Sequence, residues 1–148
     1  MTLPVLYIIV RNDLASMNSG KAIAQGSHAS NAFVKHIERH TQNTNAQSNI
    51  LTRDQDIIKS FRDWEYSTPQ GFGTVLTLEG KMNDVYTTID TFKSLGYIAS
   101  VVHDPTYPIV DGEVVHHIPL DTCAYVFVPD KHTDGVAGAL LTKYSLHK

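Results

Sequence analysis

Apolar runs and helical patterns alternate along the chain. The stretch from Val5 to Val10 (VLYIIV) is continuously apolar and rich in β-branched and aromatic residues. Such a run is typical of a strand that is buried on both faces, so we expect it to form the middle of a sheet. Shorter apolar runs predict three further strands, at residues 74–78, 97–103 and 123–128.

Four segments predict helices. The clearest covers residues 54–66, where Ile57, Phe61 and Trp64 recur three and four positions apart, as on the buried face of an amphipathic helix. The first predicted helix begins near Gly20, behind Asn18 and Ser19 as capping residues, and ends between Phe33 and Arg39. The others cover residues 83–95, closed by Gly96, and 134–144. The polar stretch 41–49 predicts a mobile surface loop.

The last third of the chain contains a segment flanked by prolines. Within it, Asp111-Gly112 between apolar residues predicts the tip of a hairpin inserted at about 105–119. The order of elements is typical of α/β proteins. We therefore expect one domain over residues 1–148: a small three-layer α/β sandwich, with a mostly parallel but mixed four-stranded sheet and helices on both faces.

Composition excludes several classes of protein. The formal net charge is -3 and the sequence pI is about 6.2, so a global basic field for nucleic acid is absent and any RNA contact must come from a local patch. One cysteine, Cys123, cannot form an internal disulfide or a Cys-rich zinc site; we expect it in the core. No apolar run reaches 18 residues, and the N-terminal sequence lacks signal-peptide features. We expect a cytoplasmic protein without a membrane partner.

The first predicted helix carries candidate chemistry. At 100° per residue, Lys21, Gln25 and His28 fall on one side and Phe33 and Ile37, with Ile23, on the other, so we expect the polar residues to point away from the core. Their small neighbours would let another molecule approach the backbone. Lys21 opposes the helix dipole unless an anion lies beside it. The polar side is therefore either an ordinary solvated surface or the wall of a binding site.

Residues 11–29 resemble the signature of a known family. Arg11 to Leu14 (RNDL), Met17, and Gly20 to Ala29 (GKAIAQGSHA) are similar to the second, archaeal and eukaryotic, type of peptidyl-tRNA hydrolase. In that family a strand ending in Val-Arg-Asn/Thr-Asp-Leu leads to Met and then Gly-Lys-x-Ala-Ala-Gln-x-Ser-His-Ala. Trp64, the strand at 74–78, the helix closed by Gly96 and a strand ending in Asp104 follow the family's order, so the resemblance covers most of the chain.

The resemblance implies a hydrolase of translation. Its substrate would be the ester between a peptide, or an N-blocked amino acid, and the 3′ end of tRNA. It implies no metal or other cofactor, and commonly a homodimer. It implies Lys21, His28 and Asp104 as catalytic residues. The residues expected to bind substrate are Asn12, Gly20, Gln25, Ser27, Thr106 and Thr122.

These residue types suit ester hydrolysis. The reaction needs a base for water and a cation or hydrogen-bond donor where the oxyanion develops. His28 can act as the base near neutral pH, with Asp104 to orient it. Lys21 can hold a terminal phosphate or stabilise the oxyanion. Lys21 and His28 are seven residues apart, about 10 Å along a helix, which suits an extended substrate.

The segment from Asp104 to Cys123 departs from the family's pattern. The family continues from its aspartate as Asp-Ala-Gly-x-Thr-Gln-Ile and soon reaches Pro-Gly-Thr, whereas this chain reads DPTYPIVDGEVVHHIPLDTC. Thr106 and Thr122 are the candidates to replace the two family threonines. The alternative is a catalytically altered relative that binds a tRNA end, a nucleotide or a protein partner without hydrolysis.

The same segment leaves two further questions open. Its histidines and aspartates are of metal-ligand type but lack a recognised ligand spacing. The residues concerned are His103, Asp104, Asp111, His116, His117 and Asp121. Tyr107, between Pro105 and Pro108, is either a rigid lid over a site or a packing residue.

Overall fold

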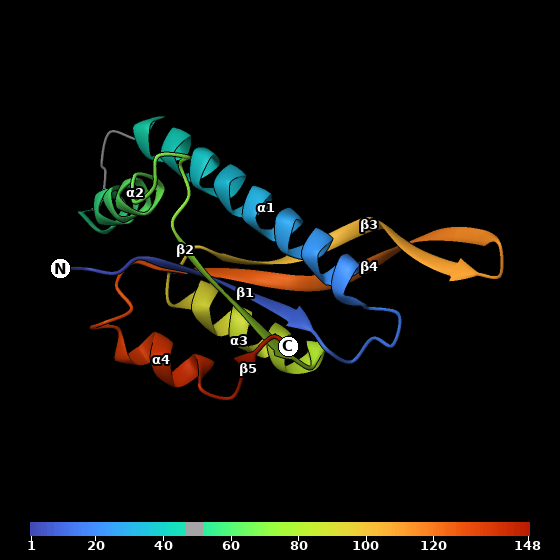
Figure 1. Ribbon diagram of the computed structural model, residues 1–148. Helices are drawn as coiled ribbons and strands as arrows, with labels where there is room; N and C mark the ends of the chain where they lie inside the picture. The colour runs from blue at the N-terminus through green and yellow to red at the C-terminus, as the bar shows by residue number, and fades with distance from the viewer. Residues whose placement is uncertain (47–51) are drawn as a thin grey trace.

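The computed structural model describes residues 1–46 and 52–148, and its strands form one mixed sheet (Figure 1). The strands are β1 (Val5–Arg11), β2 (Thr74–Gly80), β3 (Ala99–Asp111), β4 (Val114–Val128) and β5 (Ser145–Leu146). The helices are α1 (Ser19–Ala46), α2 (Thr52–Glu65), α3 (Met82–Ser94) and α4 (Gly135–Leu141). The α/β sandwich predicted from the sequence is confirmed.

The sheet order is β3-β4-β1-β2-β5, so β1 is central, as its apolar run predicts. Among the described strands, β1 and β2 are parallel and every other pairing is antiparallel. The sheet is mixed as expected, with one more strand and fewer parallel pairings. The reason is the direct turn from β3 into β4, because two strands joined by a tight hairpin must run antiparallel.

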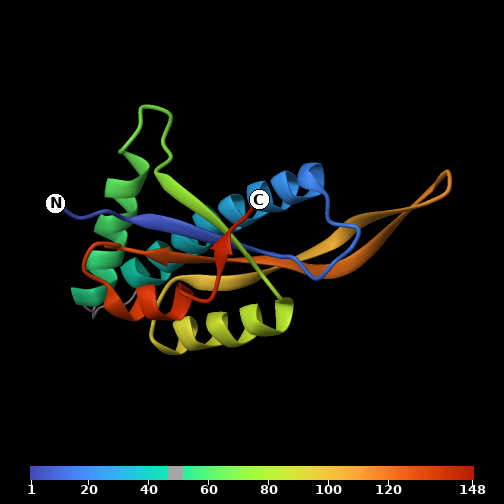
Figure 2. The same cartoon turned by 60° about the horizontal axis from the view of Figure 1, so that its bottom comes forward.

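β1 separates two hydrophobic cores. Its side chains alternate, so that Val5, Tyr7 and Ile9 face α3 and α4. Leu6, Ile8 and Val10 face α1 and α2, where Phe61 and Trp64 are buried as the helical pattern predicts. Figures 1 and 2 show the resulting three layers, with α1 and α2 on one face of the sheet and α3 and α4 on the other. Cys123 is fully buried beside β1, as expected.

α1 is longer than its pattern predicts. It continues to Ala46, so the expected loop is wrong for residues 41–46, and residues 47–49 lie outside the described part of the chain. Ile37 is buried and its carbonyl accepts a hydrogen bond from Thr41 Oγ1 at 2.9 Å. Thr41 and Gln42 line a pocket together with Phe61 and Arg62 of α2, and contact with a neighbouring helix overrides the weak helix propensity of polar residues. Neither α1 nor another described helix is long and apolar enough to span a membrane.

β3 and β4 extend well past the predicted strands and leave the body of the molecule as a two-stranded arm (Figures 1 and 2). We call residues 107–118 the ribbon. Its strands pair from Tyr107 with Ile118 to Asp111 with Val114. Gly112, with φ +61°, lies in the turn at the tip, where a residue without Cβ adopts this conformation at no steric cost. The tip lies where Asp-Gly predicts it.

Candidate functional site

A buried polar network connects α1 with β3 and β4. Gln25 Nε2 donates to Asp104 Oδ2 at 2.8 Å, and Thr122 Oγ1 donates to Gln25 Oε1 at 2.6 Å. Gln25 is 2% exposed, Asp104 7% and Thr122 0%. Each amide group of Gln25 thus has a partner, which removes the cost of burying it. The network fixes the Asp104 carboxylate against α1 at Gln25.

Asp104 is held in its ionised form. Burial by itself would raise the pKa of this carboxyl. The hydrogen bonds from Gln25 and Thr106 outweigh it, with a smaller contribution from the charge of His28, and the pKa is lowered from its ordinary value. Thr106 N donates to Asp104 Oδ1 at 2.9 Å, and its hydroxyl approaches the same oxygen at 3.3 Å. The site therefore contains a fixed negative charge at neutral pH.

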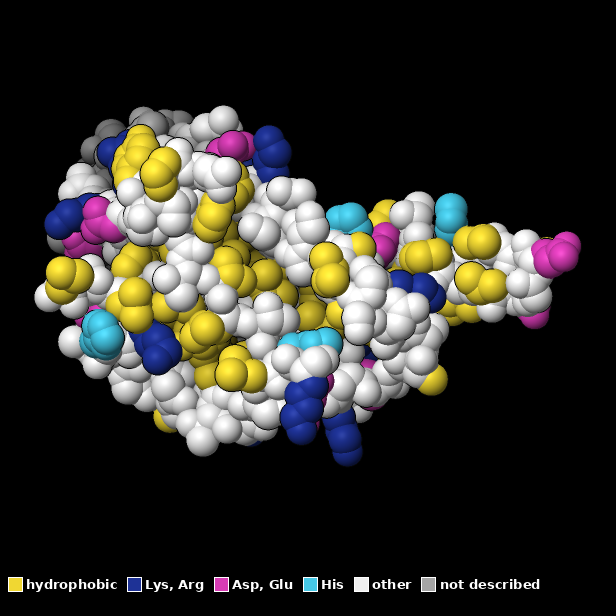
Figure 3. Space-filling model, viewed as in Figure 1, with side chains coloured by type: hydrophobic (Ala, Val, Ile, Leu, Met, Phe, Trp, Pro, Cys, Tyr) yellow, Lys and Arg dark blue, Asp and Glu magenta, His cyan; other side chains and the backbone are white. Residues whose placement is uncertain are grey.

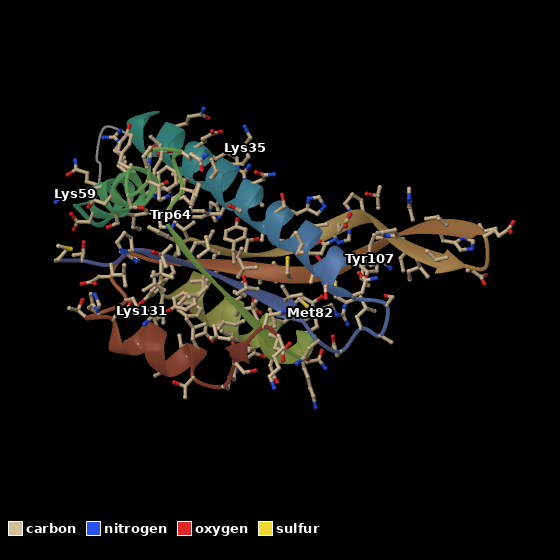
Figure 4. All side chains as sticks on the ribbon, viewed as in Figure 1. Lys35, Lys59, Trp64, Met82, Tyr107 and Lys131 are labelled. Atoms are coloured by element: carbon tan, nitrogen blue, oxygen red, sulfur yellow. The ribbon has the colours of Figure 1, made fainter. Side chains whose placement is uncertain are left out.

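Lys21 lies one turn before Gln25 on α1 and contacts the root of the ribbon. Its Nζ donates to the Pro108 carbonyl at 2.8 Å and lies 5.1 Å from the centre of the Tyr107 ring. Tyr107 itself is fully buried, and its hydroxyl is 3.1 Å from Ser16 Oγ. Figure 4 shows it beside the start of α1. Tyr107 is thus a packing residue and not a lid.

His28 lies one turn beyond Gln25 and is exposed. It makes no hydrogen bond to any residue that the structure describes, and its charge acts on Asp104. Lys21, Gln25 and His28 therefore follow one another along α1, with Asp104 opposite the middle one. The arrangement offers a free imidazole, a fixed carboxylate and a cation in one row.

The expected orientation of α1 is wrong at two positions. Gln25 continues the buried line of Ala29, Phe33 and Ile37, whereas Ile23, which was expected on the core side, is 75% exposed. These four residues are spaced four positions apart, as on one face of a helix. The helical pattern is therefore confirmed, but the prediction that Gln25 faces the solvent is wrong. A buried amide is acceptable here only because Asp104 and Thr122 satisfy it.

A comparison with protein families shows which family the chain belongs to. The family model of "Peptidyl-tRNA hydrolase PTH2" matches residues 4–114. The chain belongs to the peptidyl-tRNA hydrolase PTH2 family. A search of curated proteins found no match. The matched range includes α1 and Asp104 and ends at Val114, the first residue after the tip of the ribbon, so the return strand with Thr122 lies beyond it.

Three of the substrate-binding residues expected from the PTH2 resemblance do not join the network. Asn12 lines a pocket of about 330 Å³ together with Glu79 and the C-terminal His147 and Lys148. Gly20 lies in the first turn of α1, next to the side chain of Asn18, and Ser27 is exposed. Asn18 caps α1, its Oδ1 accepting from Lys21 N at 2.9 Å. Thr106 and Thr122 both contact the network, although the sequence around them departs from the PTH2 pattern.

The metal-type residues of the altered segment are dispersed. Asp104 faces α1, whereas Asp121 contacts His103 and also accepts a hydrogen bond from Tyr86 of α3. Asp111 and His116 lie on the ribbon, 3.9 Å apart. Among the described residues, no group of three histidine, cysteine or acidic side chains could hold a metal ion.

Sequence reasoning missed a polar cluster on the α3 side of the PTH2 fold. Asp121 accepts from Tyr86 Oη and is 2.9 Å from His103 Nδ1, while its carbonyl accepts from Arg11 at 2.9 Å. The Tyr86 hydrogen bond is the first cause that lowers the pKa of Asp121. Neighbouring strand residues point to opposite faces, so Asp121 anchors β4 from one side while Thr122 supports Gln25 on the other. The sequence signal for this cluster is the pair of adjacent polar residues Asp121-Thr122 on one strand, because each of them must find partners on its own face of the sheet.

Proposed function

We propose that this protein hydrolyses the ester between a peptide, or an N-blocked amino acid, and the 3′ end of tRNA. Family membership supports the general reaction. The observation that carries the proposal is the hydrogen bond between Gln25 and Asp104. It joins the part of α1 that matches the family's motif to the segment that departs from it, and so preserves the carboxylate at the motif.

His28 is the general base of the proposed mechanism. Its imidazole is exposed and unengaged by the described residues, so it can accept a proton from a water molecule that attacks the acyl carbon. Asp104, kept ionised by Gln25 and Thr106, stabilises the imidazolium that forms. The tetrahedral intermediate then collapses, and the proton on His28 passes to the departing 3′ oxygen of the ribose.

Lys21 supplies positive charge to the developing oxyanion. One of its three N–H donors is used by the Pro108 carbonyl, which leaves two for the acyl oxygen. The Lys21 and His28 backbones are about 10 Å apart along α1, so they act on different atoms of the substrate. Of the two roles open to Lys21, oxyanion stabilisation fits better, because the lysine lies one helical turn from Gln25, the partner of Asp104, and contacts the ribbon rather than a basic surface.

The two threonines act through Asp104 and Gln25. Thr122 is fully buried and cannot contact substrate, so we assign it the positioning of the Gln25 amide. Thr106 is exposed and donates to Asp104 from its backbone and its hydroxyl, which places it at the edge of the site. Together they replace the support that the family's usual segment would give.

The tRNA is expected to lie along α1 beyond His28. Beyond His28, the side chains described for this helix include Lys35 and Arg39 and one carboxylate, Glu38. Lys35 and Glu38 are 3.3 Å apart and exposed. This local patch is the kind of contact that a chain of net charge -3 needs to bind RNA. We also expect the protein to lie in the cytoplasm and to form a homodimer. Sedimentation velocity of the purified protein would test the dimer.

The direct test is loss of ester from N-acetyl-aminoacyl-tRNA incubated with the purified protein. We expect turnover by the wild type and at least a tenfold lower rate with Lys21→Ala, the usual effect of losing a positioned catalytic group. Lys131→Ala is the matched control, an exposed lysine on the other side of the molecule (Figure 4). Binding of the tRNA without ester loss in the wild type would support the non-hydrolytic alternative and overturn the proposal.

A further inference from the structure

The ribbon exposes apolar side chains to an unusual degree. Val110 is 62% exposed, Val114 56% and Val115 54%. Figure 3 shows hydrophobic side chains along the arm, with histidine side chains among them and acidic side chains at its tip. An isolated two-stranded hairpin is at best marginally stable in water, and exposed apolar surface that is grouped in this way commonly marks a binding site.

The backbone of the ribbon is also open. β1 pairs with β4 only from Cys123 onward, and no strand in the described part of the chain pairs with either outer edge of the ribbon. Arg11 occupies the β4 edge at the carbonyl of Asp121, where the open stretch begins. Pro105 and Pro108 remove two N–H donors from β3, whereas Pro119 removes one from the open stretch of β4, so β4 offers the fuller edge. Such an edge can bind an extended peptide by adding it as a strand.

Charge decides against RNA as the occupant. Residues 105–119 contain no lysine or arginine, and the tip carries Asp111 and Glu113. A phosphate backbone needs cations. Lys35 and Arg39 of α1 lie on the far side of His28 from the ribbon, and Lys21 at the root of the ribbon is hydrogen-bonded to the Pro108 carbonyl. The ribbon instead suits an uncharged or apolar chain in extended form.

The ribbon is continuous with the proposed site. Its root holds Lys21 through the Pro108 carbonyl and the Tyr107 ring, and Asp104 precedes it on the same strand. A substrate whose acyl oxygen contacts Lys21 and whose tRNA follows α1 must extend its peptide past Lys21. The ribbon is the surface at that end of the row.

We propose that the ribbon binds the peptide portion of a peptidyl-tRNA, an inference that rests on the proposed function. The peptide pairs with the β4 edge, and its side chains extend the two faces of the ribbon, one carrying Val115 and its partner Val110 and the other carrying Val114. The ribbon has five residue pairs, from Tyr107–Ile118 to Asp111–Val114, which span about 15 Å at roughly 3.3 Å per residue. The protein therefore prefers peptidyl groups of several residues to a single N-acetylated amino acid.

The test compares acyl groups of one and six residues. Binding is measured with amide-linked 3′-acylamino analogues of the tRNA end, and hydrolysis with the corresponding esters. We expect the six-residue analogue to bind at least tenfold more tightly. The variant Val110→Thr/Val114→Thr/Val115→Thr keeps shape and strand propensity and should reduce that preference at least threefold, because it removes apolar side-chain contacts and leaves the backbone edge open. The control Val136→Thr changes a valine on α4 that is 54% exposed and should keep the preference.

Each result has one meaning. Equal binding of the two analogues by the wild type, or a preference that is undiminished in the triple variant, overturns the ribbon proposal whether or not esters are hydrolysed. A length preference in binding without hydrolysis keeps the ribbon proposal and overturns the proposed function. A protein that is dimeric at assay concentration and becomes monomeric with the triple variant would show that a second copy covers the ribbon, which also overturns the proposal.

Discussion

Gln25 determines the chemistry of the site at the scale of single residues. A glutamine among alanines and serines on an amphipathic helix is ordinarily solvated. Here it is buried, and its partners Asp104 and Thr122 are 79 and 97 residues away in sequence. No pattern within α1 reveals partners at that distance, which is why the sequence predicted Gln25 as a site residue but placed it on the wrong side of the helix.

Replacing Gln25 by glutamate is expected to reverse the pH dependence of stability at this site. In the wild type the folded pKa of Asp104 is lowered, so its contribution is present above the ordinary carboxyl pKa and is lost as pH falls. In Gln25→Glu two carboxyls share the site, and one pKa is raised. The stability that this protonated carboxyl contributes is lost as pH rises through its raised pKa. Urea unfolding at pH 5 and pH 8 should show the variant weaker at pH 8.

The matched control for this experiment is Gln42→Glu, an exposed glutamine on the same helix. It adds the same charge to α1 at a position away from Asp104. If the free energy of unfolding of Gln25→Glu changes between pH 5 and pH 8 in the same way as that of the control, Asp104 and Gln25 are not in contact.

At the scale of elements, α3 depends on a residue from another part of the chain. Its N-cap residue, Lys81, makes no side-chain capping bond. Instead Asp13, which follows β1, accepts from Met82 N at 3.1 Å and also binds Arg11 Nε at 2.7 Å. One carboxylate thus closes the end of α3 and fixes the loop that leads into α1.

Asp13→Ala is therefore expected to destabilise the fold by about 1 kcal/mol, the usual cost of losing a helix cap. Asp84→Ala, which removes an acidic side chain from the first turn of the same helix, should cost less because it leaves the capping bond intact. Thermal or urea unfolding of the two variants measures the difference. Equal losses would show that general charge at this helix end, and not the capping bond, is responsible.

The elements show what the sequence could predict. β1 was placed at the centre because a run of six apolar residues must be covered on both faces. α2 followed from periodicity, and the end of α3 followed from Gly96. β5 has two residues and therefore no pattern. The full lengths of β3 and β4 escaped because the ribbon is exposed and its prolines are uncommon in strands, although Asp111-Gly112 marked its tip.

At the scale of the whole molecule, Cys123 reports on unfolding. It is the only cysteine of the chain. Burial raises the pKa of its thiol to about 12, and only the thiolate is reactive. We expect no labelling by Ellman's reagent at pH 8 in the native protein, and labelling in urea that follows the loss of circular dichroism. Rapid labelling without urea would show that the core around β1 and β4 opens locally.

We infer that His28 and Asp104 act together on one ester. Single-turnover hydrolysis of N-acetyl-aminoacyl-tRNA by the wild type, His28→Ala, Asp104→Asn and the double variant tests it most directly. Residues that act as one unit are not additive. We predict at least a tenfold loss in each single variant and no further loss in the double variant. A wild-type rate in both single variants, or losses that multiply, would contradict the account.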